Sequence, residues 1–142
     1  MMKSVLECGA QFSRWFRWKE REEYENIECP GVYLLAHFAA GTPVELNPQV
    51  REVVYIGQTW KQGLRKRLRK FEKSAVTGRH AHAGGRNYHI DFGSMREELC
   101  VAMWGALDLN PKTGPAFIRY IERKLIWEYA REWGETPCCN RK

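Results

Sequence analysis

Two short apolar segments joined by a turn-rich loop constrain the fold of this chain more than any other feature. Residues 31–38 read GVYLLAHF and residues 52–57 read EVVYIG, and both are rich in side chains that favour β-strands. The loop over 39–50 contains four turn-forming residues, Gly41, Pro43, Asn47 and Pro48. It holds no helix-length crossover, which a parallel pair would need. The sequence therefore predicts an antiparallel pair, on which Tyr33 and Tyr55 are able to share one face.

A strongly basic helix is predicted after the second strand, over residues 63–75. Leu64, Leu68 and Phe71 form an apolar stripe at helical spacing. Lysines and arginines fill the other faces: Arg65, Lys66, Arg67, Arg69, Lys70 and Lys73. Only Glu72 offsets this charge within the stretch, whereas a helix face that is merely solvated usually alternates in sign. The pattern favours contact with phosphates, because neutralising them releases counterions.

A second helix is predicted over residues 115–133, with Thr113 as its N-cap and Gly134 at its C-terminus. Glu122 lies in an apolar row of this helix, with apolar neighbours one turn before and one turn after it. A carboxylate in such a row is costly unless it is paired or bound to a cation. We therefore expect Glu122 to bind a metal ion or to form a salt bridge with an arginine of the basic helix.

A third buried strand is predicted over residues 98–107, which read ELCVAMWGAL. Residues 76–89 form a connection rich in glycine and histidine. The spacing of His80 and His82 could hold a metal ion, but a mobile loop beside a phosphate is the favoured interpretation. One of the two histidines is then able to donate a hydrogen bond or a proton at that site.

The N-terminal residues 3–26 are predicted to be helical or irregular. Trp15 lies in a row at helical spacing in this segment, and Trp18 adds a second apolar edge. Two interpretations remain open for them: they cap the core, or they contact a base or a protein partner.

Composition narrows the class of protein. The 142 residues predict one domain, and the net charge of +6 favours polyanionic partners without specifying a fold. No apolar run approaches the roughly 20 residues that a membrane span needs, so no membrane association is expected. The five cysteines include no C-x-x-C pair, which makes structural zinc an unfavoured prediction and favours a reducing cytoplasm.

Five short motifs, taken in order, resemble those of the GIY-YIG nuclease superfamily. They are GVY at 31–33, YIG at 55–57, LRKRL at 64–68, IERKLI at 121–126 and PCCN at 137–140. Each motif by itself is weak, since three-letter matches arise often by chance. All five in this order and spacing, over roughly residues 30–142, form a specific resemblance.

The resemblance implies a fold of the α/β class and α+β type, a small three-stranded antiparallel sheet flanked by helices. It assigns residues 29–142 to a nuclease-like domain and leaves residues 1–28 as a helical extension packed on that core, in one globular unit. It also implies hydrolysis of DNA phosphodiester bonds with one divalent cation, usually Mg²⁺, for which Mn²⁺ can substitute.

The same resemblance implies a role for each motif residue. Tyr33 and Tyr55 line one face of the sheet, and one of them serves as general base or positions the water. Arg67 neutralises the charge that builds on the pentavalent phosphorus. Glu122 ligates the metal, and Asn140 steadies the site by hydrogen bonds.

Three departures from the family pattern leave alternatives open. Arg65 is a possible substitute for the catalytic arginine. Phe71 stands where relatives often carry histidine or tyrosine, so His80 or His82 is available for that function. Glu128 lies at the more usual distance from the closing motif, although the local sequence pattern favours the glutamate already chosen.

DNA is the expected partner, contacted by a set of basic residues: Lys61, Lys66, Arg69, Lys70 and Lys73. A protein partner or self-association would supply specificity. The alternative to an enzyme is a catalytically degenerate DNA-binding module. A protein-interaction domain that uses the N-terminal aromatic residues is a third hypothesis.

Overall fold

The computed structural model describes residues 9–141. Along the chain the elements are β1 (Phe16–Arg17), η2 (Trp18–Glu23), β2 (Gly31–His37), β3 (Val53–Thr59), α1 (Leu64–Thr77), α2 (Ala83–Phe92), β4 (Leu99–Gly105), α3 (Gly114–Trp133) and η3 (Cys138–Asn140). The class is α+β, as predicted.

The sheet has four antiparallel strands in the order β1-β4-β2-β3, so the prediction of three strands was wrong. The additional strand is β1, which pairs Phe16 with Val101 and Arg17 with Cys100. A two-residue strand is too short to show an alternating pattern, and it forms only because β4 offers an edge to pair with. The predicted antiparallel pair of β2 and β3 is confirmed.

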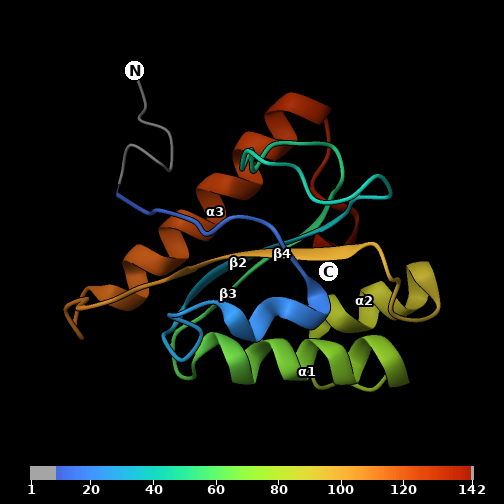
Figure 1. The fold of residues 1–142 in the computed structure, drawn as a ribbon. Helices are drawn as coiled ribbons and strands as arrows, with labels where there is room; N and C mark the ends of the chain where they lie inside the picture. The colour runs from blue at the N-terminus through green and yellow to red at the C-terminus, as the bar shows by residue number, and fades with distance from the viewer. Residues whose placement is uncertain (1–8, 142) are drawn as a thin grey trace.

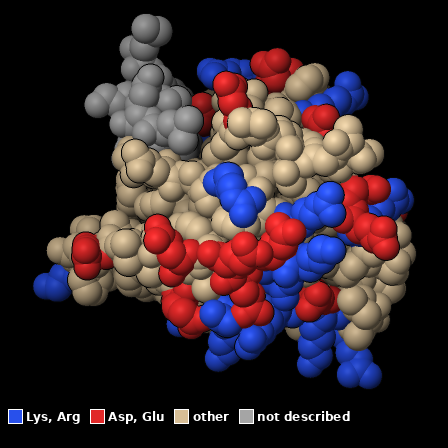
Figure 2. Space-filling view, in the orientation of Figure 1, with Lys and Arg blue, Asp and Glu red and all other residues tan. Residues whose placement is uncertain are grey.

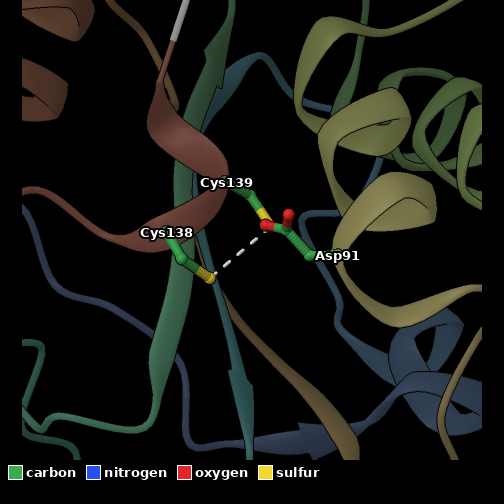
Figure 3. A group of neighbouring side chains, drawn as sticks. All are labelled: Asp91, Cys138 and Cys139. Atoms are coloured by element: carbon green, nitrogen blue, oxygen red, sulfur yellow. Dashed lines mark hydrogen bonds between the residues drawn. The ribbon is translucent and has the colours of Figure 1, made fainter.

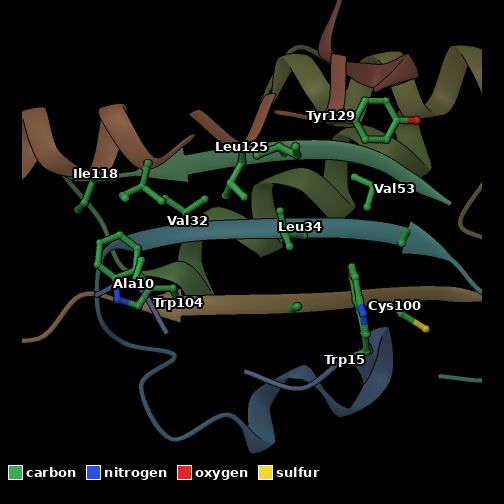
Figure 4. Close-up of a cluster of buried hydrophobic side chains, with 14 of the residues drawn as sticks. Ala10, Trp15, Val32, Leu34, Val53, Cys100, Trp104, Ile118, Leu125 and Tyr129 are labelled. Atoms are coloured by element: carbon green, nitrogen blue, oxygen red, sulfur yellow. The ribbon is translucent and has the colours of Figure 1, made fainter. Parts of the chain in front are cut away.

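Helices cover both faces of the sheet (Figure 1). Helix α3 lies on one face, and α1 and α2 lie on the other. Figure 4 shows Ile118 and Leu125 of α3 beside Val32 and Leu34 of β2. A second group of buried side chains lies on the other face of the sheet, between the strands and helices α1 and α2, and it includes Tyr33. Tyr33 faces away from Val32 and Leu34 because successive side chains of a strand point to opposite faces.

The N-terminal segment contains a short strand and a 3₁₀-helix within residues 9–28, and the part of the predicted extension over residues 1–8 lies outside the described residues. Trp15 is 1% exposed and packs edge-on against Phe38. Trp18 is 8% exposed, and its Nε1 donates to Glu72 at 2.8 Å. The interpretation that these tryptophans cap the core is confirmed.

The predicted connection over 76–89 was wrong in its second half, where α2 begins at Ala83. The segment Ala83-Gly84-Gly85 has weak helix propensity. The glycines are needed for packing: a Cβ on Gly84 would lie 2.4 Å from Cε1 of Tyr55, and one on Gly85 would lie 2.6 Å from the carbonyl oxygen of Phe71. Close packing against β3 and α1 therefore overrides local propensity.

Helices α1 and α3 lie where the sequence predicts them. Helix α3 ends at Trp133, and the next residue, Gly134, has a left-handed φ of 83° and donates its N–H to the carbonyl oxygen of Ala130. Thr113 occupies the N-cap position, but its side chain makes no capping hydrogen bond. Among residues 9–141, no helix is long and apolar enough to cross a membrane.

Candidate active site

The two predicted tyrosines share one face of the sheet. Tyr33 pairs in register with Gly57, and Leu35 pairs with Tyr55, so the tyrosines are diagonal neighbours with ring centroids 6.0 Å apart. Gly57 leaves the room for them, because a Cβ there would lie 2.6 Å from Cζ and Oη of Tyr33 and from Cε2 of Tyr55. Tyr33 is fully buried, whereas Tyr55 keeps partial access to solvent.

His82 binds the buried tyrosine. Its Nε2 lies 2.6 Å from the hydroxyl of Tyr33, and its Nδ1 accepts from the N–H of Gly85 at 3.1 Å. A nitrogen that accepts carries no hydrogen, so the pattern assigns the neutral tautomer with its hydrogen on Nε2. Burial, followed by the charges of Arg67 and Lys70, lowers the pKa of His82 to about 3. The imidazole is therefore neutral near pH 7 and donates to Tyr33.

The other histidine of the predicted pair lies elsewhere. His80 is exposed and contacts Arg86, and neither residue forms a hydrogen bond or ring contact with a site tyrosine within the described chain. Of the two histidines that the sequence offered as substitutes, the fold brings only His82 to the tyrosines.

Both tyrosines are held in the neutral form. Burial raises the pKa of Tyr33 well above its ordinary value, and Arg67 acts in the opposite direction. Burial, followed by the charge of Glu122, raises the pKa of Tyr55 to about 12, which Arg67 and the hydroxyl of Tyr33 partly oppose. A neutral Tyr55 hydroxyl orients a water molecule better than it removes a proton from one.

Arg67 and Arg65 lie on different sides of α1. The charge of Arg67 lowers the pKa of Tyr33, Tyr55 and His82, which places the half-buried guanidinium among these groups. Arg65 instead forms ion pairs with Glu22 and Glu28 of the N-terminal segment. Arg67 is thus brought to the tyrosines and Arg65 is not.

Glu122 reaches the same region from α3. Burial raises the pKa of its carboxyl group, against the charges of Arg123, Arg119 and then Arg67. Across residues 9–141 no ion pair joins Glu122 to an arginine or lysine, so the expected salt bridge with the basic helix is not formed.

Glu128, the alternative metal ligand, has a different environment. It is 7% exposed and accepts a hydrogen bond from Nε2 of Gln49 at 3.3 Å. Glu122 is among the largest contributors to the raised pKa of both Tyr33 and Tyr55, and Glu128 is not. The fold therefore separates the two glutamates that the sequence left as alternatives.

Asn140 fastens the end of the chain to the strand that carries Tyr55. Its Oδ1 accepts from the N–H of Ile56 at 2.9 Å, and its Nδ2 donates to the carbonyl oxygen of Ile56 at 2.8 Å. Because Ile56 lies between Tyr55 and Gly57, these bonds hold the backbone directly behind the tyrosines.

The predicted DNA contacts lie on or beside α1. Lys61, Lys66, Arg69 and Lys73 are exposed and Lys70 is half-buried. Blue side chains gather along the lower edge of Figure 2, where Figure 1 shows α1, with red acidic side chains next to them. Glu22 lies 3.9 Å from Arg69, so the N-terminal segment offsets part of the basic charge that the local sequence left uncompensated.

Two residues beside the site were missed by the sequence reasoning. Arg119 and Arg123 flank Glu122 on α3 and lower the pKa of its carboxyl group. Arg119 lies three residues before Glu122 and Arg123 one residue after it, a spacing that could have pointed to both arginines from the sequence.

Comparison of the chain with protein-family models, with curated proteins and with solved structures found no match in any of the three.

Proposed function

We propose that this protein is a divalent-metal-dependent DNA endonuclease with a GIY-YIG-like site. The observation that carries the proposal is a cluster assembled from five separate segments of the chain. The sheet contributes Tyr33 and Tyr55, and the segment before α2 contributes His82, which contacts Tyr33. The charges of Arg67 from α1 and Glu122 from α3 act on both tyrosines. A base or water positioner, a cation and a carboxylate are the groups that phosphodiester hydrolysis requires.

The tyrosines and the histidine form a directed hydrogen-bond chain. Gly85 donates to His82, and His82 donates to the hydroxyl oxygen of Tyr33. The Tyr33 hydroxyl keeps its own hydrogen to donate, and its interaction with Tyr55 lowers the pKa of Tyr55, as a donor would. Tyr55 is partly exposed at the end of this chain. It is therefore the tyrosine that we assign to the attacking water.

Arg67 and Glu122 have complementary roles. The guanidinium of Arg67 stabilises negative charge on the phosphate oxygens as the water adds and a P–O bond breaks. The carboxylate of Glu122 fits a magnesium ion, which proteins usually hold through one or two carboxylates together with substrate phosphates. Glu122 would hold that ion, which supplies Lewis acidity at the phosphate.

The basic residues of α1 would hold the DNA backbone. Lys66 and Lys73 are exposed, and neither forms an ion pair with a described residue. Lys61, Arg69 and Lys70 extend the same charged surface. Such contacts supply affinity and orientation without sequence information.

A matched pair of glutamate variants tests the enzyme. Supercoiled plasmid and branched DNA are incubated with the protein across a series of Mg²⁺ and Mn²⁺ concentrations. Cleavage should require the metal, should be lost in Glu122→Gln, and should persist in Glu128→Gln. No cleavage of any DNA form across the metal series would reject the proposal.

A matched pair of arginine variants tests the assigned cation. Arg67→Ala should lower the cleavage rate by about a hundredfold or more, the usual cost of removing a group that stabilises the transition state. Arg65→Ala should leave the rate close to that of the unmodified protein, because its partners are Glu22 and Glu28. Equal losses in the two variants would contradict the assignment.

A catalytically degenerate DNA-binding module is the second candidate, and the raised pKa values of both tyrosines favour it. It predicts binding that weakens steeply with salt, is unchanged in Glu122→Gln, and is not accompanied by nicking. A fluorescence anisotropy titration at several salt concentrations, run beside the cleavage assay, separates the two functions.

A further inference from the structure

The C-terminal turn η3 meets helix α2 at three side chains outside the tyrosine site. Asp91 comes from α2, and Cys138 and Cys139 come from η3 (Figure 3). The two sulfur atoms lie 3.8 Å apart, and Sγ of Cys139 lies 3.8 Å from Oδ2 of Asp91. All three potential ligand atoms lie within 4.8 Å of one another.

Two of these separations are close to the edges of a small metal tetrahedron. Zinc binds thiolate sulfur at about 2.3 Å and carboxylate oxygen at about 2.0–2.2 Å, so tetrahedral geometry places two sulfurs about 3.8 Å apart and a sulfur and an oxygen about 3.6 Å apart. The sulfur–sulfur distance of 3.8 Å equals the first value. The third edge, between Sγ of Cys138 and the carboxylate of Asp91, lies within 4.8 Å. Binding therefore requires the Asp91 carboxylate to move toward the two sulfurs, which a side-chain rotation supplies.

We propose that Asp91, Cys138 and Cys139 bind a thiophilic divalent cation, with Zn²⁺ as the best fit, and that a water completes the tetrahedron. Two sulfur ligands exclude Mg²⁺ as the preferred ion, since hard cations select oxygen. The site is therefore distinct in chemistry from the single carboxylate at Glu122.

The surrounding charges suit a divalent ion. Two thiolates and one carboxylate carry three negative charges, and Arg141 supplies one positive charge through hydrogen bonds of 2.6 and 2.8 Å to Asp91. The remaining two negative charges balance a divalent cation. The bond from Nη2 of Arg141 to Oδ1 can persist while Oδ2 binds the metal, which is a common arrangement around ligating carboxylates.

Access and burial also suit the site. Cys138 is exposed and offers a route for the ion, whereas Cys139 is 1% exposed and holds its sulfur away from bulk water. Asn87 further ties the segment to α2, donating to the carbonyl oxygens of Cys139 and Arg141. The two cysteines of η3 are therefore held next to Asp91 by hydrogen bonds between this C-terminal segment and α2.

Metal binding here would fasten the end of the chain. The residue after Cys139 is Asn140, which holds the backbone of Ile56. A metal that joins η3 to α2 adds a link that exists only in the folded state, so the bound ion stabilises the fold. The effect requires no nuclease activity.

The test uses the full chain with Co²⁺ as a spectroscopic probe for the zinc site. We expect a near-ultraviolet thiolate-to-cobalt charge-transfer band that is displaced by stoichiometric Zn²⁺ and is untouched by excess Mg²⁺. Zn²⁺ should also raise the thermal midpoint of the apo-protein. Cys138→Ser, at an exposed position, should abolish the band and the thermal shift, and Asp91→Asn should weaken Zn²⁺ binding by about tenfold or more.

Cys29→Ser is the matched control, because Cys29 lies outside the cluster and is a free thiol in the described chain. It should keep both signals, and so should Glu122→Gln, which separates this proposal from the nuclease proposal. Absence of the band, its survival in Cys138→Ser, or its equal loss in Cys29→Ser would each overturn the zinc site.

Discussion

The side-chain amide of Asn140 lies against the peptide backbone of Ile56, 84 positions away in the sequence, and both its oxygen and its nitrogen are used. This pair joins the C-terminal turn η3 to the edge strand β3. The same strand carries Tyr55 and Gly57. The integrity of the tyrosine cluster therefore depends on a residue from the far end of the chain.

Asn140→Ala should destabilise the protein by about 2 kcal/mol, because it removes two hydrogen bonds and leaves partly buried backbone groups unsatisfied. Urea unfolding monitored by tryptophan fluorescence measures the loss. Asn47→Ala is the control, since among residues 9–141 the Asn47 side chain accepts one hydrogen bond, from the N–H of Gln49 in an exposed turn. Equal losses of unfolding free energy in the two variants would show that the bonds to Ile56 stabilise the fold no more than the exposed hydrogen bond of Asn47.

Tyr33→Phe and Tyr55→Phe should differ in their effects on stability. Tyr33→Phe leaves the Nε2–H of the buried His82 without its partner, and this should cost about 1–3 kcal/mol. Tyr55→Phe should cost less, because Tyr55 is partly exposed. Denaturant unfolding of both variants checks the order. For cleavage the order should reverse, with the greater loss in Tyr55→Phe.

Gly57→Ala should disturb both tyrosine rings. The added Cβ would lie 2.6 Å from atoms of Tyr33 and Tyr55, and overpacking of this kind typically costs about 1–3 kcal/mol. If the Tyr55 ring contributes, Gly57→Ala should cost less in a Tyr55→Leu background, where only the contact with Tyr33 remains. A double-mutant cycle of unfolding free energies measures that coupling, and strictly additive losses would exclude the Tyr55 ring as an origin of the destabilisation.

Stability should fall on acidification because of His82. Its pKa is lowered to about 3 in the folded protein, from 6.5 in the unfolded chain. Between these values the unfolded chain binds a proton and the folded protein does not, so stability is full above about pH 6.5 and is lost as the pH falls toward 3. From pH 7 to pH 5 this one group should remove about 2 kcal/mol.

The measurement is the free energy of unfolding at pH 7 and pH 5 for the unmodified protein and for His82→Gln. The decrease should be smaller in His82→Gln by about 2 kcal/mol. His80→Gln is the control, because His80 is exposed, and it should keep the full decrease. His37 also has a lowered pKa from burial and contributes equally to all three proteins, so the difference isolates His82.

The sequence by itself determined the elements whose signals are local. Strands β2 and β3 and helices α1 and α3 follow from apolar periodicity, turn residues and the left-handed glycine after Trp133. The positions of Tyr33, Tyr55 and Glu122 on those elements were equally readable, as was the basic character of α1.

Tertiary structure alone decided the remaining features. Strand β1 forms only where β4 offers an edge. Helix α2 forms despite two glycines because it packs closely against β3 and α1, where Tyr55 and Phe71 leave no room for a Cβ. The choices of Arg67 over Arg65 and of His82 over His80 depended on partners distant in the sequence. The same is true of Asp91 beside Cys139. Local patterns specify the face of a helix or strand, but only packing of distant segments determines which groups meet there.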